Sequence, residues 1–219
     1  MANKRGFTEP MEDFLLSSQA EEGLRALGQQ NLANQYHLAL LTQLRATYTP
    51  EQAGALLSLA ITRQKAADKF PEADRLFFTP EALEQATTWP IAQHRAAYLH
   101  RHAPPGPVLD LGCGIGGDTL ALARHRSVIA YETDPMRLRF AQANAAALGL
   151  AGQVDFRLAD WAEELAGDRL PFAAAAFADP ARRAEGRRLF GLEQMIPPLS
   201  VLLRRSEEHT SELQSLTNL

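Results

Sequence analysis

The chain has 219 residues, of which 46% are hydrophobic and 22% charged, and a formal net charge of −4. These fractions are typical of a globular protein, and the mildly acidic charge gives no electrostatic footprint for nucleic acid. No apolar run is long enough to span a bilayer, and residues 1–6 lack the apolar segment of a secretory signal. Cys113 is the single cysteine, which excludes an internal disulfide. We expect a cytoplasmic protein with no membrane partner; the oligomeric state is left open.

The first part of the chain, residues 1–103, predicts an all-helical N-terminal domain. Apolar residues follow a helical stripe through residues 14–27, and a second helical segment covers residues 32–48, with Tyr36 on its apolar face. The segment Thr49-Pro50-Glu51-Gln52 predicts a capped helix start, because threonine, proline and glutamine stand where a capping box requires them.

A linker, Pro104-Pro105-Gly106-Pro107, hands over to residues 104–204, in which strand and helix patterns alternate. The expected helices cover residues 118–125, 135–148 and 161–165. This alternation predicts an α/β fold, with a Rossmann-like, doubly wound parallel sheet that binds its ligand at the carboxyl ends of the strands.

The most informative segment is Val108–Asp118, where a short apolar run ends in Asp110 and a glycine-rich turn follows. Glycines allow positive φ angles and let a ligand approach the backbone closely. A second apolar strand ends in Glu132, about 20 residues after Gly112, where an acid can accept both hydroxyls of a ribose. The segment therefore predicts a nucleotide-binding strand, turn and helix.

Three interpretations of this site differ in the ligand or in the chemistry. Gly112, Gly114 and Gly117 match the G-x-G-x-x-G pattern of dinucleotide sites, which fits a dinucleotide-dependent oxidoreductase. Asp110 and Asp118 flank the turn, however, and would repel the pyrophosphate of a dinucleotide. Two carboxylates suit a ligand with a sulfonium or ammonium group, such as S-adenosylmethionine. A noncatalytic nucleotide-binding module is the third interpretation.

Residues 110–116 resemble the first motif of the class I S-adenosylmethionine-dependent methyltransferases. The resemblance implies that fold, that cofactor and a methyl transfer. It implies cofactor contacts from the glycine turn and from the ends of three strands: Asp110, Gly112, Gly114, Gly116, Asp118, Glu132, Asp160 and Trp161. After the fourth strand, Asp179-Pro180 resembles the motif beside the transferred methyl group, which implies catalytic roles for Asp179, Pro180 and Arg182.

Two further segments, residues 76–83 and 179–183, resemble a bacterial group related to trimethylguanosine synthase. Members of that group carry a THUMP-like RNA-binding domain at the C-terminus, so the resemblance implies RNA as substrate and partner. It also adds Phe78 and Thr79 to the predicted cofactor site. Arg182 suits stacking on a base or gripping a phosphate, and it equally suits a surface pair with Glu185.

Several predicted site residues also have an ordinary structural interpretation. Phe78 and Thr79 fit a hydrophobic staple at a helix start. Asp160 fits the N-cap of a helix, as Asp134 does before Pro135, and Trp161 fits a packing residue of the core.

The C-terminal residues 205–219 resemble the in-frame translation of a common sequencing adapter, so we expect the natural sequence to end near Arg204. The methyltransferase domain is then truncated after about four strands, and we expect the fragment to be inactive alone. The histidines lack the context of metal ligands, and no metal is predicted.

Overall fold

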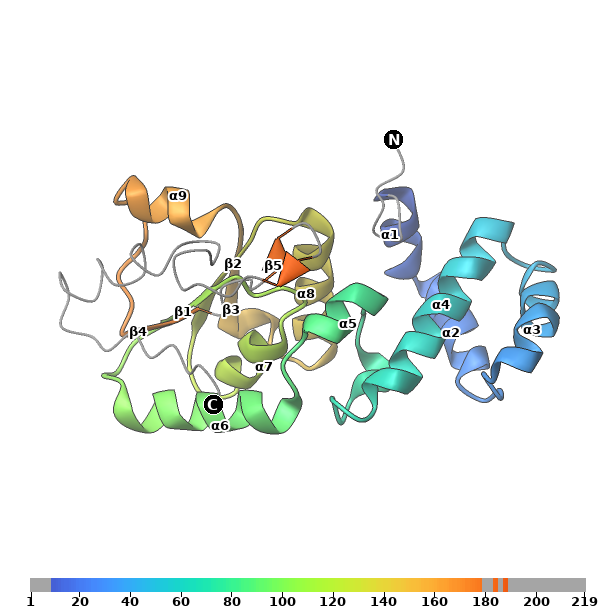
Figure 1. Ribbon diagram of the computed structural model, residues 1–219, viewed down its shortest axis with the longest axis horizontal. Coiled ribbons are helices and arrows are strands. Elements are labelled where there is room, and N and C mark those ends of the chain that lie inside the picture. Colours follow the sequence, from blue (N-terminus) through green and yellow to red (C-terminus); the bar gives the residue numbers. More distant parts are fainter. Residues whose placement is uncertain (1–8, 179–182, 185–186, 189–219) are drawn as a thin grey trace.

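The computed structural model describes residues 9–178, 183–184 and 187–188 (Figure 1). A group of helices lies at one end of the molecule, and a parallel sheet with its own helices lies at the other (Figure 1). This architecture confirms the predicted fold class.

The helical part, residues 9–85, is organised around one long helix. Its elements are α1 (Glu9–Leu15), α2 (Ser18–Leu27), α3 (His37–Leu44), α4 (Pro50–Ala66) and α5 (Pro80–Gln85), with short 3-10 turns η1 (Asn34–Tyr36) and η2 (Ala73–Arg75). Helices α1, α2 and α3 pack against α4, whose Leu56 and Leu59 are fully buried. The predicted capping box starts α4: the Thr49 hydroxyl accepts from the Gln52 N–H at 3.2 Å, and the Gln52 side chain accepts from the Thr49 N–H at 3.0 Å.

The prediction of one helical segment over residues 32–48 is wrong. The chain forms the turn η1 first and begins α3 only at His37, whose ring N–H donates to the Leu32 carbonyl at 2.8 Å. Tyr36 therefore closes a turn and is 42% exposed, whereas Leu40 and Leu44 of α3 are buried. The apolar stripe through residues 14–27 is likewise divided between α1 and α2, because Ser17 caps the start of α2.

The sheet part, residues 89–178, contains four parallel strands in the order β3-β2-β1-β4. The strands are β1 (Val108–Leu111), β2 (Val128–Glu132), β3 (Val154–Leu158) and β4 (Ala175–Ala178). Their connections carry α7 (Gly117–Ala123), α8 (Pro135–Ala147), a 3-10 turn η3 (Ala151–Gln153) and α9 (Trp161–Ala166), close to the predicted helices. Beyond β4, the short strands β5 (Arg183–Ala184) and β6 (Arg187–Arg188) form a separate antiparallel pair.

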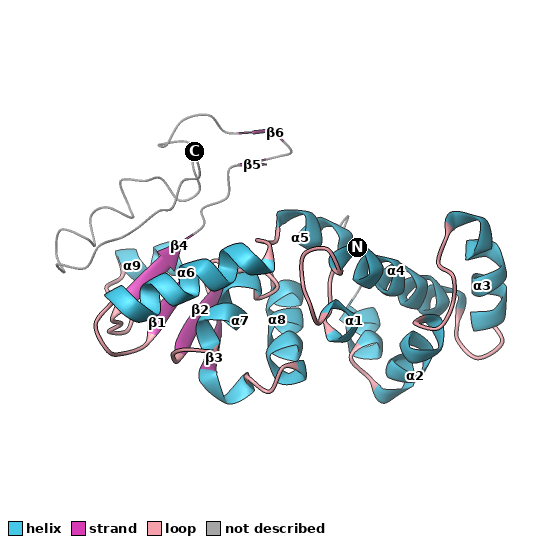
Figure 2. Ribbon diagram, turned by 90° about the horizontal axis from the view of Figure 1, so that it is seen from below, coloured by secondary structure: helices cyan, strands magenta, loops and turns pink. Residues whose placement is uncertain are grey.

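The two faces of the sheet have different coverings (Figure 2). Val108 and Ala130 belong to the main core, which they share with residues of α6 (Trp89–His102), α7 and α8. Leu109 and Tyr131 point to the opposite face and form a smaller core with Trp161 of α9. Because α6 packs against α7, it lies with the sheet part; the domain division at residue 103 stays a prediction.

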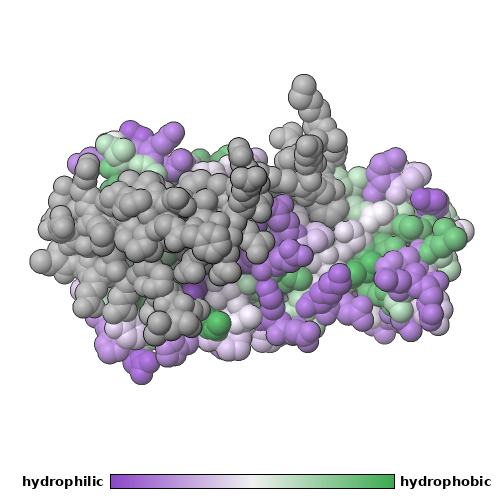
Figure 3. Space-filling model, in the orientation of Figure 1, coloured by the Kyte–Doolittle hydropathy of each residue, from purple (hydrophilic) through white to green (hydrophobic). Residues whose placement is uncertain are grey.

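The surface of the described residues mixes hydrophobic and hydrophilic side chains at the helical end (Figure 3). Leu38 of α3 is 75% exposed there. None of the helices in the described ranges combines the length and the apolar character that a membrane span requires.

Candidate functional site

The glycine turn joins β1 to α7 at the carboxyl edge of the sheet. Gly112, Gly114 and Gly116 have φ angles of +106°, +57° and +92°, as the sequence predicts. Residues that carry a side chain rarely adopt such angles. A Cβ on Gly116 would also lie 3.4 Å from the Cβ of Ala141 on α8. Glycine at this position thus allows the turn to pass closely over α8.

Asp110 lies in β1, two residues before Gly112, and is almost completely buried, with 1% exposure. Its carboxylate accepts a hydrogen bond from the hydroxyl of Thr119 on α7. In the sheet register it lies between Ala130 of β2 and Phe177 of β4. A buried carboxylate therefore stands on an inner strand of the four-stranded sheet, two residues before Gly112.

Glu132, the last residue of β2, holds the turn from the neighbouring strand. One carboxylate oxygen accepts from the Gly114 N–H at 2.8 Å, and the other accepts from the N–H groups of Thr133 and Asp134 at 2.8 and 2.9 Å. The side chain is 8% exposed. Hydrogen bonds from backbone N–H groups to a carboxylate are charge-assisted and strong, so Glu132 fixes the turn relative to the end of β2.

The pKa of the Cys113 thiol reflects the negative charges near the turn. Burial raises its pKa well above the usual range, and the charges of Asp110 and Glu132 raise it further. Both carboxylates thus disfavour a further negative charge in the turn. This negative field opposes an anionic ligand and favours a cationic one.

Asp118, in the first turn of α7, pairs with a residue that the sequence analysis missed. Its carboxylate lies 3.2 Å from the guanidinium of Arg95 on α6, and the two side chains are 12% and 11% exposed. Arg95 also donates to the Thr87 hydroxyl at 3.2 Å and stacks over the Phe177 ring at 5.1 Å. Arg95 therefore offsets the charge of Asp118 and ties α6 to α7 and β4. The predicted contact of Asp118 with the cofactor stays a prediction.

Asp160 and Trp161 lie where β3 leads into α9, and both have structural roles. Asp160 is the N-cap of α9, accepting from the Ala162 N–H at 2.8 Å. Trp161 is 7% exposed and packs in the smaller core beneath the sheet. Leu158, by contrast, is 56% exposed and pairs with Glu132 in the register of β2 and β3, so the carboxyl edge presents an apolar side chain beside that acid.

Phe78 and Thr79 lie just before α5 and are also structurally engaged. Phe78 is 1% exposed and its ring lies 5.5 Å from that of Phe70. Thr79 caps α5 by accepting from the Ala82 N–H at 3.0 Å. The preceding residue, Phe77, is bonded through its backbone to Asn144 of α8, a second residue that the sequence analysis did not single out.

The predicted catalytic residues Asp179, Pro180 and Arg182 lie outside the described residues. Strand β4 ends at Ala178, which pairs with Leu111 at the end of β1. In the described ranges, no three histidine, cysteine, aspartate or glutamate side chains gather closely enough to hold a metal ion.

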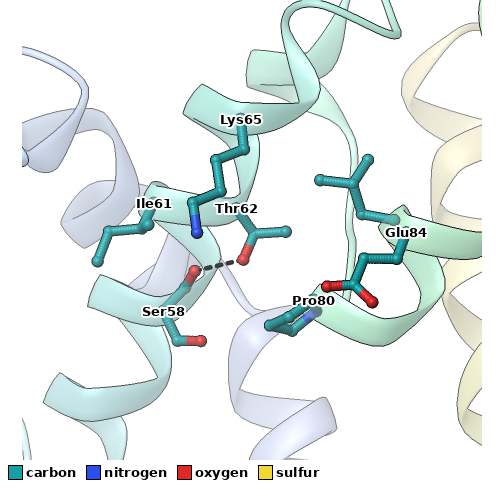
Figure 4. A pocket seen from close by; sticks show the side chains of 7 residues that line it. Ser58, Ile61, Thr62, Lys65, Pro80 and Glu84 are labelled. Carbon is teal, nitrogen blue, oxygen red and sulfur yellow. Dashed lines mark hydrogen bonds between the residues drawn. The ribbon is translucent and has the colours of Figure 1, made fainter.

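A separate pocket lies between α4 and α5 (Figure 4). Its volume is about 160 Å³, below the roughly 300–1,000 Å³ of ordinary ligand sites. The pocket is lined by Ser58, Ile61, Thr62, Lys65, Pro80, Leu83 and Glu84. None of these residues belongs to the predicted site, so we take the carboxyl edge of the sheet as the candidate functional site.

Known proteins resemble the sheet part of this chain. Residues 108–179 match the family described as "Methyltransferase domain". Two curated relatives, from the CDC 1551 and H37Rv strains of Mycobacterium tuberculosis, are named uncharacterized S-adenosylmethionine-dependent methyltransferases. Each is 37% identical over 163 residues, which are 71% of this chain and 42% of the relative. The chain thus spans less than half the length of these relatives.

A further relative and a solved structure complete the comparison. A release factor glutamine methyltransferase of Cereibacter sphaeroides is 43% identical over 61 residues, 26% of this chain and 22% of that protein. The crystal structure of a putative methyltransferase from Porphyromonas gingivalis W83 covers 78% of this chain and 47% of its own, with a TM-score of 0.59 and 20% identity; it shares the fold. Residues 108–179 thus match a methyltransferase domain, and the enzyme class predicted for the whole protein stays a proposal. The relatives' names agree with the predicted cofactor.

Proposed function

We propose that the carboxyl ends of β1, β2 and β3, with the glycine turn, bind S-adenosylmethionine, and that the protein containing this chain transfers its methyl group to RNA. The observation that carries the first part is the turn itself: positive-φ glycines are flanked by two buried acids, Asp110 and Glu132, inside a methyltransferase domain.

The charge of this turn fits the ligand. Burial raises the pKa of the Cys113 thiol, and the negative field of Asp110 and Glu132 raises it further. A pyrophosphate at the same place would meet that field with the wrong sign. S-adenosylmethionine carries a sulfonium and an ammonium group and no phosphate. The two carboxylates therefore suit it better than they suit a dinucleotide.

In this proposal each acid has a different task. Glu132 accepts the ribose hydroxyls; one of its oxygens accepts a hydrogen bond from the Gly114 N–H, and a carboxylate oxygen has a second lone pair. Asp110 and the N–H groups of the turn hold the methionine half. Asp160 meets the adenine amino group at the end of β3, where Leu158 supplies an exposed apolar side chain.

When bound, S-adenosylmethionine supplies an electrophilic methyl group on a sulfonium. The residues of this chain contribute position and electrostatics, which provide much of the rate in a displacement. Asp179, Pro180 and Arg182 face the acceptor in the proposal, on the resemblance of Asp179-Pro180 to the motif beside the transferred methyl.

RNA as the substrate rests on the resemblance of residues 76–83 and 179–183 to the trimethylguanosine synthase relatives with a THUMP-like domain. That resemblance also assigns Phe78 and Thr79 to the cofactor pocket. Their burial beside Phe70 and their place at the start of α5 suit a fixed wall of such a pocket.

Calorimetric titration of the chain tests the cofactor. We expect S-adenosylhomocysteine and S-adenosylmethionine to bind and NAD not to bind. Binding of NAD without binding of S-adenosylmethionine or S-adenosylhomocysteine would overturn the proposal in favour of an oxidoreductase.

Transfer of a radiolabelled methyl group tests the substrate. The complete gene product is incubated with total RNA or with total protein of its host. We expect label in the RNA, with loss of transfer in Asp179→Ala at unchanged affinity for S-adenosylhomocysteine. Label in protein alone would replace the RNA part of the proposal and leave the cofactor part intact.

A further inference from the structure

Asn144 lies on α8 with 1% exposure and bonds to two segments that are far from it in the sequence. Its side-chain oxygen accepts from the Phe77 N–H at 2.6 Å. Its side-chain nitrogen donates to the carbonyls of Phe77 at 3.1 Å and Ile115 at 3.0 Å. One buried amide thus joins the residue before Phe78 to the glycine turn.

The hydrogen-bonding capacity of this amide is fully matched to its surroundings. Both of its N–H groups face carbonyl oxygens, and its oxygen faces an N–H group. An aspartate would place oxygen against two carbonyls, and an apolar side chain would remove a partner from three backbone groups, of which the Ile115 carbonyl is buried. Asparagine is therefore the side chain that the position demands.

The neighbours of Asn144 bring the same two segments together. Phe140, one turn earlier on α8, places its ring 5.8 Å from that of Phe77. Ala141 touches the position at which Gly116 lacks a side chain, at 3.4 Å. From α4, the Arg63 guanidinium donates to the Leu76 carbonyl at 2.7 Å and stacks 5.1 Å from the Phe77 ring. The inner face of α8 thus lies between residues 76–79 and the glycine turn.

We infer that Asn144 is a positioning residue for the cofactor: it sets the distance between the glycine turn and Phe78-Thr79, the two walls that the proposed function assigns to the pocket. This inference rests on the proposed function. Asn144 acts through the backbone groups of Phe77 and Ile115, so its role does not depend on which side chain stands at position 77. A displacement of about 1 Å in such walls is enough to weaken binding strongly.

The first experiment compares binding and stability in matched variants. Asn144→Asp and Asn144→Ala are titrated with S-adenosylhomocysteine by calorimetry, well below their melting temperatures. Thr62→Ala is the control, because Thr62 is a buried polar residue with 4% exposure whose hydroxyl donates within α4, to the Ser58 carbonyl. We expect both Asn144 variants to lose about tenfold or more in affinity, with the control within about twofold of the wild type.

A second measurement uses the wild-type protein and does not depend on whether the variants fold. Hydrogen exchange is followed at the Phe77 N–H, which Asn144 holds, and at the Gln52 N–H, which the α4 cap holds. We expect saturating S-adenosylhomocysteine to slow exchange at Phe77 more than at Gln52.

The outcomes separate the two proposals. If the wild type binds S-adenosylhomocysteine and the folded Asn144 variants bind it equally well, or if the two amides respond alike to the ligand, the role of Asn144 is overturned and the proposed function stands. If the wild type binds neither S-adenosylmethionine nor S-adenosylhomocysteine, the proposed function fails and the inference fails with it.

Discussion

The helix caps of the helical part and the candidate site of the sheet part satisfy their polar groups over very different distances along the chain. In the helical part, Ser17 and Thr49 cap helices by bonding to backbone groups three residues away. In the sheet part, Glu132 reaches back to Gly114 and Asn144 reaches back to Phe77. The helices are therefore specified locally, whereas the geometry of the candidate site depends on contacts between distant segments.

This contrast has an experimental consequence. Substitutions in α1–α4 that touch neither residues 76–79 nor α8 should change the free energy of unfolding and leave ligand affinity alone, because the proposed pocket keeps its contacts. Substitutions at the carboxyl ends of the strands should change affinity. Four variants test whether the two properties separate in this way.

The largest expected effect is on the core of the helical part. Leu56→Ala should lower the free energy of unfolding by about 2–5 kcal/mol, because Leu56 is fully buried in α4 and its loss leaves a cavity. Urea denaturation measures this, and calorimetry at low temperature should show unchanged affinity for S-adenosylhomocysteine. Leu38→Ala is the control: Leu38 is 75% exposed, so a change within about 0.5 kcal/mol is expected. A loss of affinity in folded Leu56→Ala would show that the two parts are coupled.

The next effect concerns the carboxyl edge of the sheet. Glu132→Ala should weaken binding of S-adenosylhomocysteine by about 1–3 kcal/mol, because the ribose loses a charged acceptor and Gly114 loses its partner. Glu163→Ala removes the same charge from the exposed side of α9 and serves as the control in the same titration. Equal affinity in the two variants would remove Glu132 from the proposed site.

A smaller effect is expected at the capping box of α4. Thr49→Ala should lower the free energy of unfolding by about 1 kcal/mol, because the N–H of Gln52 loses its acceptor. Thr42→Ala is the matched control, since Thr42 lies exposed within α3 and its hydroxyl donates back to the Leu38 carbonyl, where alanine is the better helix former. If denaturation midpoints fell equally in both variants, the cap would carry no special stability.

The smallest effect is a pH dependence from Cys113. Its pKa is raised in the folded state by burial and by Asp110 and Glu132, so ionisation favours the unfolded chain once the pH passes the unfolded value of about 8.5. The stabilising contribution of the neutral thiol is therefore complete below that pH and declines above it. Between pH 7 and 9, wild type should lose about 0.8 kcal/mol more than Cys113→Ala. Parallel pH profiles would show that the thiol titrates normally.

The features that the sequence predicts well are those with local causes. The caps of Thr49 and Asp134, the alternation of strands and helices, and the positive φ angles of the glycine turn all follow from residues within a few positions of one another. The prediction for Tyr36 was wrong because the chain forms the 3-10 turn η1 (Asn34–Tyr36) before α3 begins at His37.

The features that the sequence does not predict depend on tertiary contacts. Asn144 has the appearance of an ordinary polar residue in a helix, and nothing near it in the sequence indicates that its amide meets Phe77 and Ile115. Arg95 is equally inconspicuous in α6. Both become informative only when the fold brings their partners to them.

The ion pair between Arg95 and Asp118 has a consequence for how this protein can vary among related sequences. Both side chains are nearly buried, at 11% and 12% exposure, and removing one partner of such a pair leaves the other charge without compensation, which is strongly destabilising. Replacing both at once by apolar residues of similar size is far less costly. An alignment of relatives should therefore show positions 95 and 118 changing together, and either change alone should be rare.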